Sequence, residues 1–109
     1  MTQFTAGVKN YWGVQVGRSK TNSHKYGTTS SEFSIVVTDL YSYITQINKD
    51  NLIIMDAIDV MHGNGGPSFG SMKHLGLILA SNNSVSLDSV AVSIGKMNPF
   101  DILILKILS

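Results

Sequence analysis

The sequence predicts an α/β fold in which helices flank a small mixed or parallel sheet. Two short apolar runs, Leu52–Met55 and Leu75–Ala80, have the length and composition of buried strands. Apolar side chains recur at helical spacing before and after these runs. Hydrophobic residues make up 43% of the chain and charged residues 14%, which suits a packed core and is too apolar for disorder.

The length and the residue types narrow the class of protein. With 109 residues, the chain is expected to form one α/β domain, residues 1–109. It has no cysteine, which excludes disulfides, thiolate nucleophiles and any iron–sulfur cluster held by thiolates of this chain. No apolar run reaches the roughly 18 residues of a membrane span, and residues 1–10 lack the order of a signal peptide, so the expected location is cytoplasmic.

The charges are unevenly distributed. Lys9, Arg18, Lys20 and Lys25 lie within the first 31 residues, which contain no Asp or Glu, while the remainder is net acidic. Three interpretations stay open: a solvated face, a site for an anionic small molecule, or a nucleic-acid surface. Nucleic acid is the least favoured because the four cations do not form a run.

The first helix is expected near residues 5–16. Thr5 can cap it, and its stripe would consist of Val8, Tyr11, Trp12 and Val16. Residues 18–31 have no apolar period and predict a long polar connection, of the kind that is either functional or disordered. His24 lies in this connection, either as an exposed loop histidine or as a ligand-binding or catalytic residue.

The second helix is expected over residues 32–47. Thr29 and Glu32 match a capping box, in which each side chain satisfies a backbone donor of the other residue. The predicted buried stripe is Phe33, Val36, Val37, Leu40, Ile44 and Ile47.

The first strand is expected to stop near Asp56. Side chains alternate along a strand, so Asp56 and Asp59 cannot share a face of a straight strand. A carboxylate in the middle of a buried strand is costly unless it is paired. We therefore expect Asp56 at the carboxyl end of a strand, where ligands collect in open α/β sheets.

Two more helices are expected near residues 87–97 and 99–108. Ser84 or Ser86 would cap the first of them, with a stripe of Leu87, Val90, Ala91 and Ile94. Asp88 would lie in its first turn, where the helix dipole favours a negative charge.

The C-terminal run Ile102–Leu108 is apolar nearly all round, which indicates association or truncation. Two strands alone make an incomplete sheet. We expect either that one more strand is hidden in a segment interpreted as helix, or that the sheet is completed by a second copy or by a missing N-terminal half. A homodimer would form through a sheet edge or through Ile102–Leu108.

The loop from His62 to Gly70 is the first place to look for a site. Its glycines could present backbone N–H groups to an anion, or they could simply connect two strands. The segment is neither a phosphate-binding Walker loop nor a dinucleotide fingerprint. Four residues near it are candidate ligands of an unidentified metal: Asp56, Asp59, His62 and His74. The Asp56 and His62 pair is a candidate for acid–base chemistry.

Several stretches together resemble the family known as domain of unknown function 362. The stretches are Gly7–Asn10 with Gly13, His24, Asp39–Tyr41, Asp56–Ile58, Met61–Pro67 with Gly70, Leu75–Ser81 and Ser86–Ala91. Their order and spacing are more specific than any single motif. Members are usually at least twice as long, so the chain resembles the C-terminal part of one.

The resemblance implies a redox-associated setting, because many members carry ferredoxin-like cysteine motifs for four-iron clusters. None of these cysteines is present here, so no iron–sulfur cluster is expected on this chain. Recurring polar or glycine positions of the family match Lys9, Asn10, His24, Asp56, Gly63, Gly65, Pro67 and Asp88. The chain departs from the family at His62, where an acid is common, and at the extra glycine of Gly65–Gly66.

Two functional hypotheses follow. The first is a ligand-binding or catalytic fragment of a redox-associated, iron–sulfur-linked enzyme family. Its candidate catalytic residues are Asp56, His62 and His24. Its candidate ligand-binding residues are Lys9, Asn10, Gly63, Asn64, Gly65, Gly66 and Asp88. The second is a non-catalytic binding or scaffolding domain, in which the glycine-rich loop has only a structural role.

Overall fold

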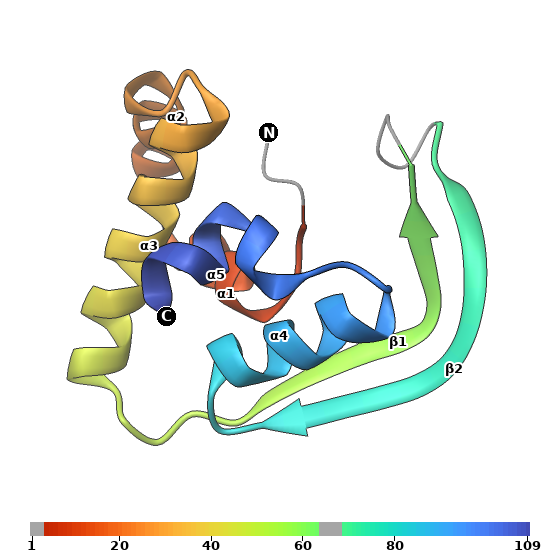
Figure 1. Ribbon diagram of the computed structural model, residues 1–109. Coiled ribbons are helices and arrows are strands. Elements are labelled where there is room, and N and C mark those ends of the chain that lie inside the picture. The colour runs from red at the N-terminus through yellow and green to blue at the C-terminus, as the bar shows by residue number, and fades with distance from the viewer. Residues whose placement is uncertain (1–3, 64–68) are drawn as a thin grey trace.

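A computed structural model describes residues 4–63 and 69–109 and confirms the α/β class. The elements in chain order are α1 (Gly7–Asn10), the 3-10 helix η1 (Tyr11–Val14), α2 (Gly17–Tyr26), α3 (Ser30–Ile47), β1 (Ile53–His62), β2 (Ser71–Ser81), α4 (Ser84–Ile94), the 3-10 helix η3 (Pro99–Asp101) and α5 (Leu103–Leu108). Helices gather on one side of a long hairpin formed by β1 and β2, and α4 lies along it (Figure 1).

The sheet consists of β1 and β2 paired antiparallel, so the expected mixed or parallel pairing is wrong. Only residues 63–70 separate the two strands. A parallel crossover needs about a dozen residues or more, whereas a short connection returns the chain antiparallel.

The first strand does not stop near Asp56 but continues to His62. A bulge interrupts the register, with Leu75 and Gly76 of β2 opposite Ile58 of β1. Gly76 has a φ of +67°, a conformation that favours glycine. Asp56 is exposed, and its Oδ1 accepts a hydrogen bond from the Ile58 N–H at 2.9 Å. The cost assumed for a mid-strand carboxylate does not arise, because this face of the sheet is open to solvent.

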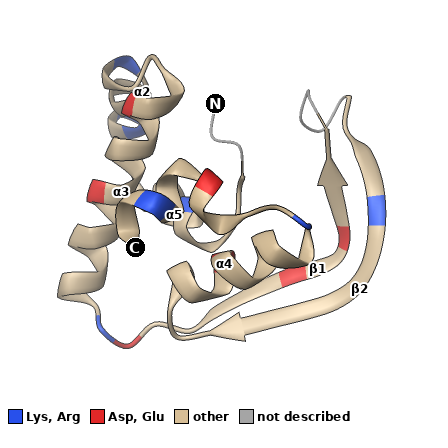
Figure 2. Cartoon of the chain, viewed as in Figure 1, with Lys and Arg blue, Asp and Glu red and all other residues tan. Residues whose placement is uncertain are grey.

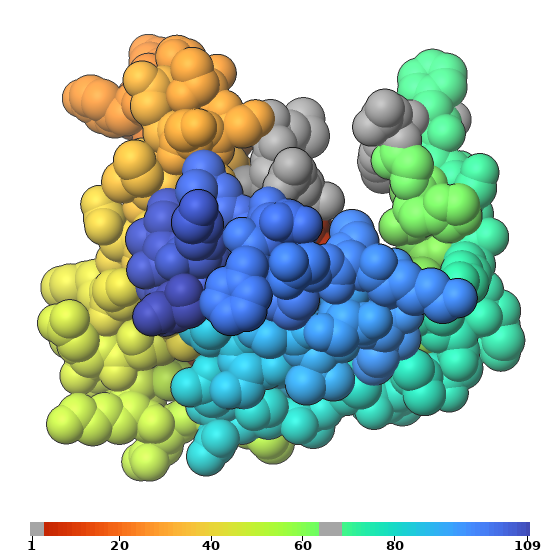
Figure 3. Space-filling view, in the orientation of Figure 1, coloured from red at the N-terminus to blue at the C-terminus, as the bar shows by residue number. Residues whose placement is uncertain are grey.

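Only one face of the sheet is covered. Ala57 on that face is buried, and α4 packs against β2. On the opposite face, Ile54 and Ile78 are each 66% exposed. The hairpin curves toward the side on which the helices lie, and its far end stands apart from them in this view (Figure 1 and Figure 3). The sheet therefore contributes a single inner face to the core.

The main core lies between the N-terminal helices, α3 and α5. Its buried members are Val8, Trp12, Phe33, Val37, Tyr41 and Ile104. The capping box of Thr29 and Glu32 at the start of α3 is confirmed. The predicted α3 stripe is confirmed at Phe33 and Val37, but the buried face is rotated from the prediction, because Tyr41 is buried while Ile47 is 68% exposed.

The C-terminal apolar run, whose composition suggested association or truncation, is largely covered by its own chain. Ile102, Ile104 and Leu105 are between 3% and 5% exposed, and α5 packs against α3 and α4. A short helix buried on several sides needs this composition. Within residues 4–63 and 69–109, no helix combines the length and the apolar character needed to cross a bilayer.

Two helix beginnings differ from the prediction. The cap of α4 is Asn83, whose Oδ1 accepts from the Ser86 N–H at 2.9 Å, in place of Ser84 or Ser86. The cap position of α1 is Ala6, whose side chain makes no capping bond, in place of Thr5. The backbone N–H groups in the first turn of α1 donate instead to Asp88, which is distant in sequence.

Candidate functional site

Asp88 joins the C-terminal half of the chain to the N-terminal helix. The backbone N–H groups of Gly7 and Val8 donate to Oδ1 and Oδ2 of Asp88, at 2.7 and 2.9 Å. These N–H groups have no partner within α1, because the first turn of a helix leaves its donors free. Asp88 is 3% exposed and lies beyond the first turn of α4, which corrects the helix-dipole explanation. Its two oxygens are thus occupied by backbone donors.

The packing around Asp88 leaves no room for a side chain at Gly7. A Cβ at that position would lie 2.9 Å from Oδ1 of Asp88. Ser84, Asp88 and Val92 are spaced four residues apart and are all buried on one stripe of α4. The predicted stripe is incorrect at Val90, which is 53% exposed. α4 therefore faces α1 with a stripe that is partly polar.

The protonation of Asp88 is expected to couple to stability. Burial raises the pKa of this carboxyl above its ordinary value of 3.8, and the N–H donors of Val8 and Gly7 act in the opposite direction. A carboxyl whose pKa is raised by folding holds its proton more tightly in the folded state. Its contribution to stability is fully present below the unfolded pKa and is lost as the pH rises through the folded pKa.

Asp88→Asn should remove this pH dependence, because the amide does not titrate. As the pH falls from about 7 to about 4, the free energy of unfolding of the native chain should rise relative to that of Asp88→Asn. Urea denaturation of both proteins at the two pH values measures this difference. A difference that is constant or moves the other way would contradict the raised pKa.

His24 lies on a helix, not on the polar connection expected for residues 18–31. α2 buries none of its own residues, which explains why no apolar period marks it in the sequence. α2 contacts the core through the ring of His24. The His24 ring stacks on Phe33 with a centroid distance of 5.2 Å and an interplanar angle of 7°. The same ring meets Trp12 edge to face at 5.2 Å.

Lys9 reaches the same aromatic group from α1. Its Nζ lies 5.8 Å from the centroid of the Phe33 ring and donates to Oγ1 of Thr5 at 3.0 Å. Burial of the side chain lowers the pKa of Lys9. Asn10 follows Lys9 and is exposed. Lys9 and His24, two candidate site residues that are distant in sequence, thus converge on one phenylalanine ring.

The cations of the N-terminal region have no acidic partners. In the part of the chain that the structure describes, the single ion pair joins Asp59 and His74, so Lys9, Arg18, Lys20 and Lys25 pair with no carboxylate. Three of the four lie on α2, where Lys and Arg segments are visible in Figure 2. Lys9 is the cation whose Nζ lies against the Phe33 ring, and an ammonium group beside the ring of His24 forms an environment that favours an anion.

The candidate metal ligands are spread along the hairpin. Nδ1 of His74 lies 2.8 Å from Oδ1 of Asp59, and both side chains are more than half exposed. Asp56 is opposite Ile78, on the other side of the bulge, and His62 ends β1. Among the described residues, no three His, Cys, Asp or Glu side chains could hold one metal ion.

The three proposed catalytic residues are similarly separated. Asp56 and His62 lie on β1, whereas His24 lies on α2. Gly63 has a φ of +99°, which suits the beginning of a turn. The predictions for Asn64, Gly65 and Gly66, and the family position Pro67, lie outside the described residues.

Sequence reasoning missed the functional interest of Phe33 and Trp12, which it assigned only to the core. Their rings meet at 4.8 Å and support His24 and Lys9. A signal was present in the glycines at 17 and 27, which bound the polar segment and fit the two ends of a helix.

Comparison with known proteins identifies a family. The family model described as "Domain of unknown function (DUF362)" matches residues 1–93, which include α1, α2, α3, β1 and β2 and nearly all of α4. Neither a curated protein nor a solved structure matches the chain.

Proposed function

The chain belongs to the family described as domain of unknown function (DUF362), and we propose that within this family it binds an anionic small molecule at the cluster of Lys9, His24, Trp12 and Phe33. The observation that carries the proposal is the convergence of Lys9 and His24 on the Phe33 ring. The family description names no activity, so the chemistry of these residues has to supply the substrate class.

The cluster combines positive charge with a rigid aromatic support, because Trp12 and Phe33 are buried and hold the polar groups of Lys9 and His24 in place. Lys9 at the Phe33 ring, together with Arg18, Lys20 and Lys25 of α2, offers positive charge, and none of these side chains forms an ion pair with a described residue. Desolvation lowers the pKa of Lys9, and an anion next to the ammonium group would reverse this effect. The imidazole of His24 adds a hydrogen-bond donor or acceptor at the same place. A small anion that bears a phosphate group suits this position, because the buried Phe33 and Trp12 rings position Lys9 and His24.

The redox, iron–sulfur-linked setting implied by the family resemblance is part of this proposal, with the ligand bound by this chain and the redox chemistry carried out elsewhere. A cluster held by cysteines has to come from another polypeptide segment, because this chain has none. We assign His24 to binding in preference to catalysis, because Asp56 and His62 are not beside it. We also propose a cytoplasmic location, since the absence of cysteine fits a reducing compartment.

Lys9→Gln should weaken the binding of inorganic pyrophosphate about tenfold, because a charged hydrogen-bond donor is lost. Isothermal titration calorimetry measures the affinity. His24→Gln should weaken binding by a smaller factor. Lys49→Gln is the matched control, because Lys49 is an exposed lysine outside the cluster. Equal losses for Lys9→Gln and Lys49→Gln would contradict a specific site and indicate only long-range charge.

A second candidate function, a non-catalytic scaffolding domain, is favoured by a different observation. The described sheet has two strands, both with a free edge, and one of its faces is uncovered. Isolated two-stranded sheets are marginally stable in water. Association through this sheet, most simply as a homo-oligomer, is the form that such a function would take.

A further inference from the structure

The segment Leu77–Ser81 of β2 forms a free edge of the sheet that lacks the usual protection against pairing with another strand. β2 contains no carboxylate, and its lysine, Lys73, lies beyond the bulge at Gly76. Leu77–Ser81 therefore has no charge, no proline and no bulge, which are the usual devices that protect an edge strand from pairing. β1 differs, because it carries Asp56 and Asp59 and contacts α1.

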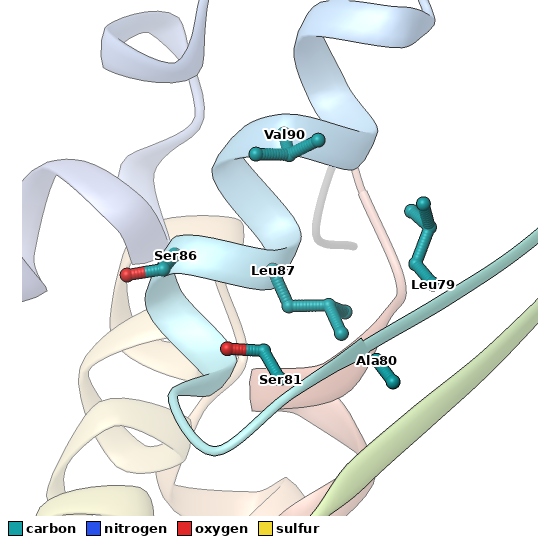
Figure 4. Close-up of a pocket in the computed structure, with 6 residues that line it drawn as sticks. All are labelled: Leu79, Ala80, Ser81, Ser86, Leu87 and Val90. Atoms are coloured by element: carbon teal, nitrogen blue, oxygen red, sulfur yellow. The ribbon is translucent and has the colours of Figure 1, made fainter.

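An apolar groove runs beside this edge. It has a cavity volume of about 190 Å³ and lies between β2 and α4. Leu79 and Ser81 point toward α4, whereas Ala80 points away from it (Figure 4). The lining residues are Leu79, Ala80, Ser81, Ser86, Leu87 and Val90. A strand added next to β2 would place its own inward side chains at the mouth of this groove.

The exposed area of the chain is large enough for an interface. The chain exposes 7355 Å², whereas a compact monomer of 11.8 kDa is expected to expose about 5,900 Å². The excess of about 1,400 Å² belongs to the chain as a whole and fits a sheet with one uncovered face. A standard interface takes roughly 800 Å² from each partner. The radius of gyration, 13.9 Å, is also above the value of about 13.1 Å expected for this length.

We propose that β2 pairs antiparallel with β2 of a second copy, across a two-fold axis at Leu79, to form a four-stranded sheet. In this register Leu79 faces Leu79 of the second copy, and Ile78 faces Ala80 of the second copy. The second copy's Leu79 extends over the groove beside Val90. A two-fold pairing of β2 opposes no carboxylates, and it joins two sheet edges whose free backbone groups match by symmetry.

The outer face continues across the axis in this arrangement. Ile78 and Ala80 of one copy pack against Ala80 and Ile78 of the other, whereas Ile54 of β1 lies one strand further from the axis. Such cross-strand apolar pairs are the units that stabilise a sheet. The interface is distinct from the cluster at Lys9 and His24. Dimer formation can therefore be confirmed or contradicted whether or not the chain binds an anion.

The first test is the mass in solution, measured by light scattering after size exclusion at about 50 μM, a concentration at which a micromolar dimer is populated. The native chain should be a dimer, and Ile78→Lys should weaken the dimer at least about tenfold. Ile54→Lys is the matched control, since Ile54 has the same 66% exposure on the same face. It should leave the dimer intact. A native monomer, or equal losses in both variants, would overturn edge pairing.

The second test reads the register and does not depend on weakening the dimer. The chain has no cysteine, so Leu79→Cys introduces a single thiol at the axis. Mild oxidation should link two chains of Leu79→Cys, because side chains directly opposite in an antiparallel pair have Cβ atoms about 5 Å apart. The same treatment of Ile54→Cys should give no linked dimer. A dimer that cross-links through Ile54→Cys and not through Leu79→Cys would contradict the proposed axis.

Discussion

Asp88→Ala should lower the free energy of unfolding by about 3 kcal/mol, the largest effect that we expect from a single carboxylate of this chain. The substitution leaves the N–H groups of Gly7 and Val8 without the oxygens that they now reach at 2.7 and 2.9 Å. Each buried donor that loses its partner costs about 1–3 kcal/mol. Urea denaturation followed by circular dichroism measures the loss.

Asp39→Ala is the control for this experiment. Asp39 also lies inside a helix, so the change in helix propensity is the same, but its side chain is exposed. We expect a change within about 0.5 kcal/mol. Similar losses for the two variants would show that Asp88 does not act through its contacts with α1.

Gly27→Ala should destabilise the fold by about 2 kcal/mol through overpacking. A Cβ at Gly27 would lie 2.8 Å from Cα and 3.0 Å from N of Phe33, and these backbone atoms cannot move aside cheaply. The shift would separate α2 from α3 and disturb the stacking of His24 on Phe33. Thermal denaturation measures the stability, and the fluorescence of Trp12, the single tryptophan, reports the cluster.

Gly17→Ala provides the comparison at the other end of α2. A Cβ there meets no atom within 4 Å. Alanine is a better helix former than glycine, so this variant should be as stable as the native chain or slightly more stable. If Gly27→Ala were equally well tolerated, the close approach of Gly27 to Phe33 would be refuted.

The sequence predicted those features that depend on local patterns. The capping box of Thr29 and Glu32 fixes the beginning of α3, and both strands were identified from short apolar runs. The family was also identified from ordered motifs, which the family model confirms over residues 1–93. In each case the signal lies within a few neighbouring residues or in their spacing.

The predictions that were wrong concern features that depend on contacts between residues distant in sequence. α2 buries no side chain, and it is held in place by the ring of His24, so no period could reveal it. Asp88 looked like a first-turn residue because its actual partners, Gly7 and Val8, are about 80 positions away. The register of the hairpin includes a bulge at Gly76, and β1 continues past Asp56 because the face that carries Asp56 is open to solvent.

The candidate site was predicted only as a set of residue types. Lys9 was named from the charge distribution and His24 from the polar segment, and both also match family positions, but only the fold brings them to one ring. Asp56, His62 and His74 were grouped by proximity in sequence, but a long antiparallel hairpin spreads neighbouring residues over its length and over both faces.

The most direct test of the proposed function is the location of anion binding in the native chain. We would titrate inorganic pyrophosphate into the ¹⁵N-labelled protein and follow the amide resonances together with the indole N–H of Trp12. The proposal predicts saturable shifts at Lys9, His24 and Phe33 and at the Trp12 indole. Shifts confined to the hairpin around Asp59 and His74, or no saturable shift at all, would contradict it.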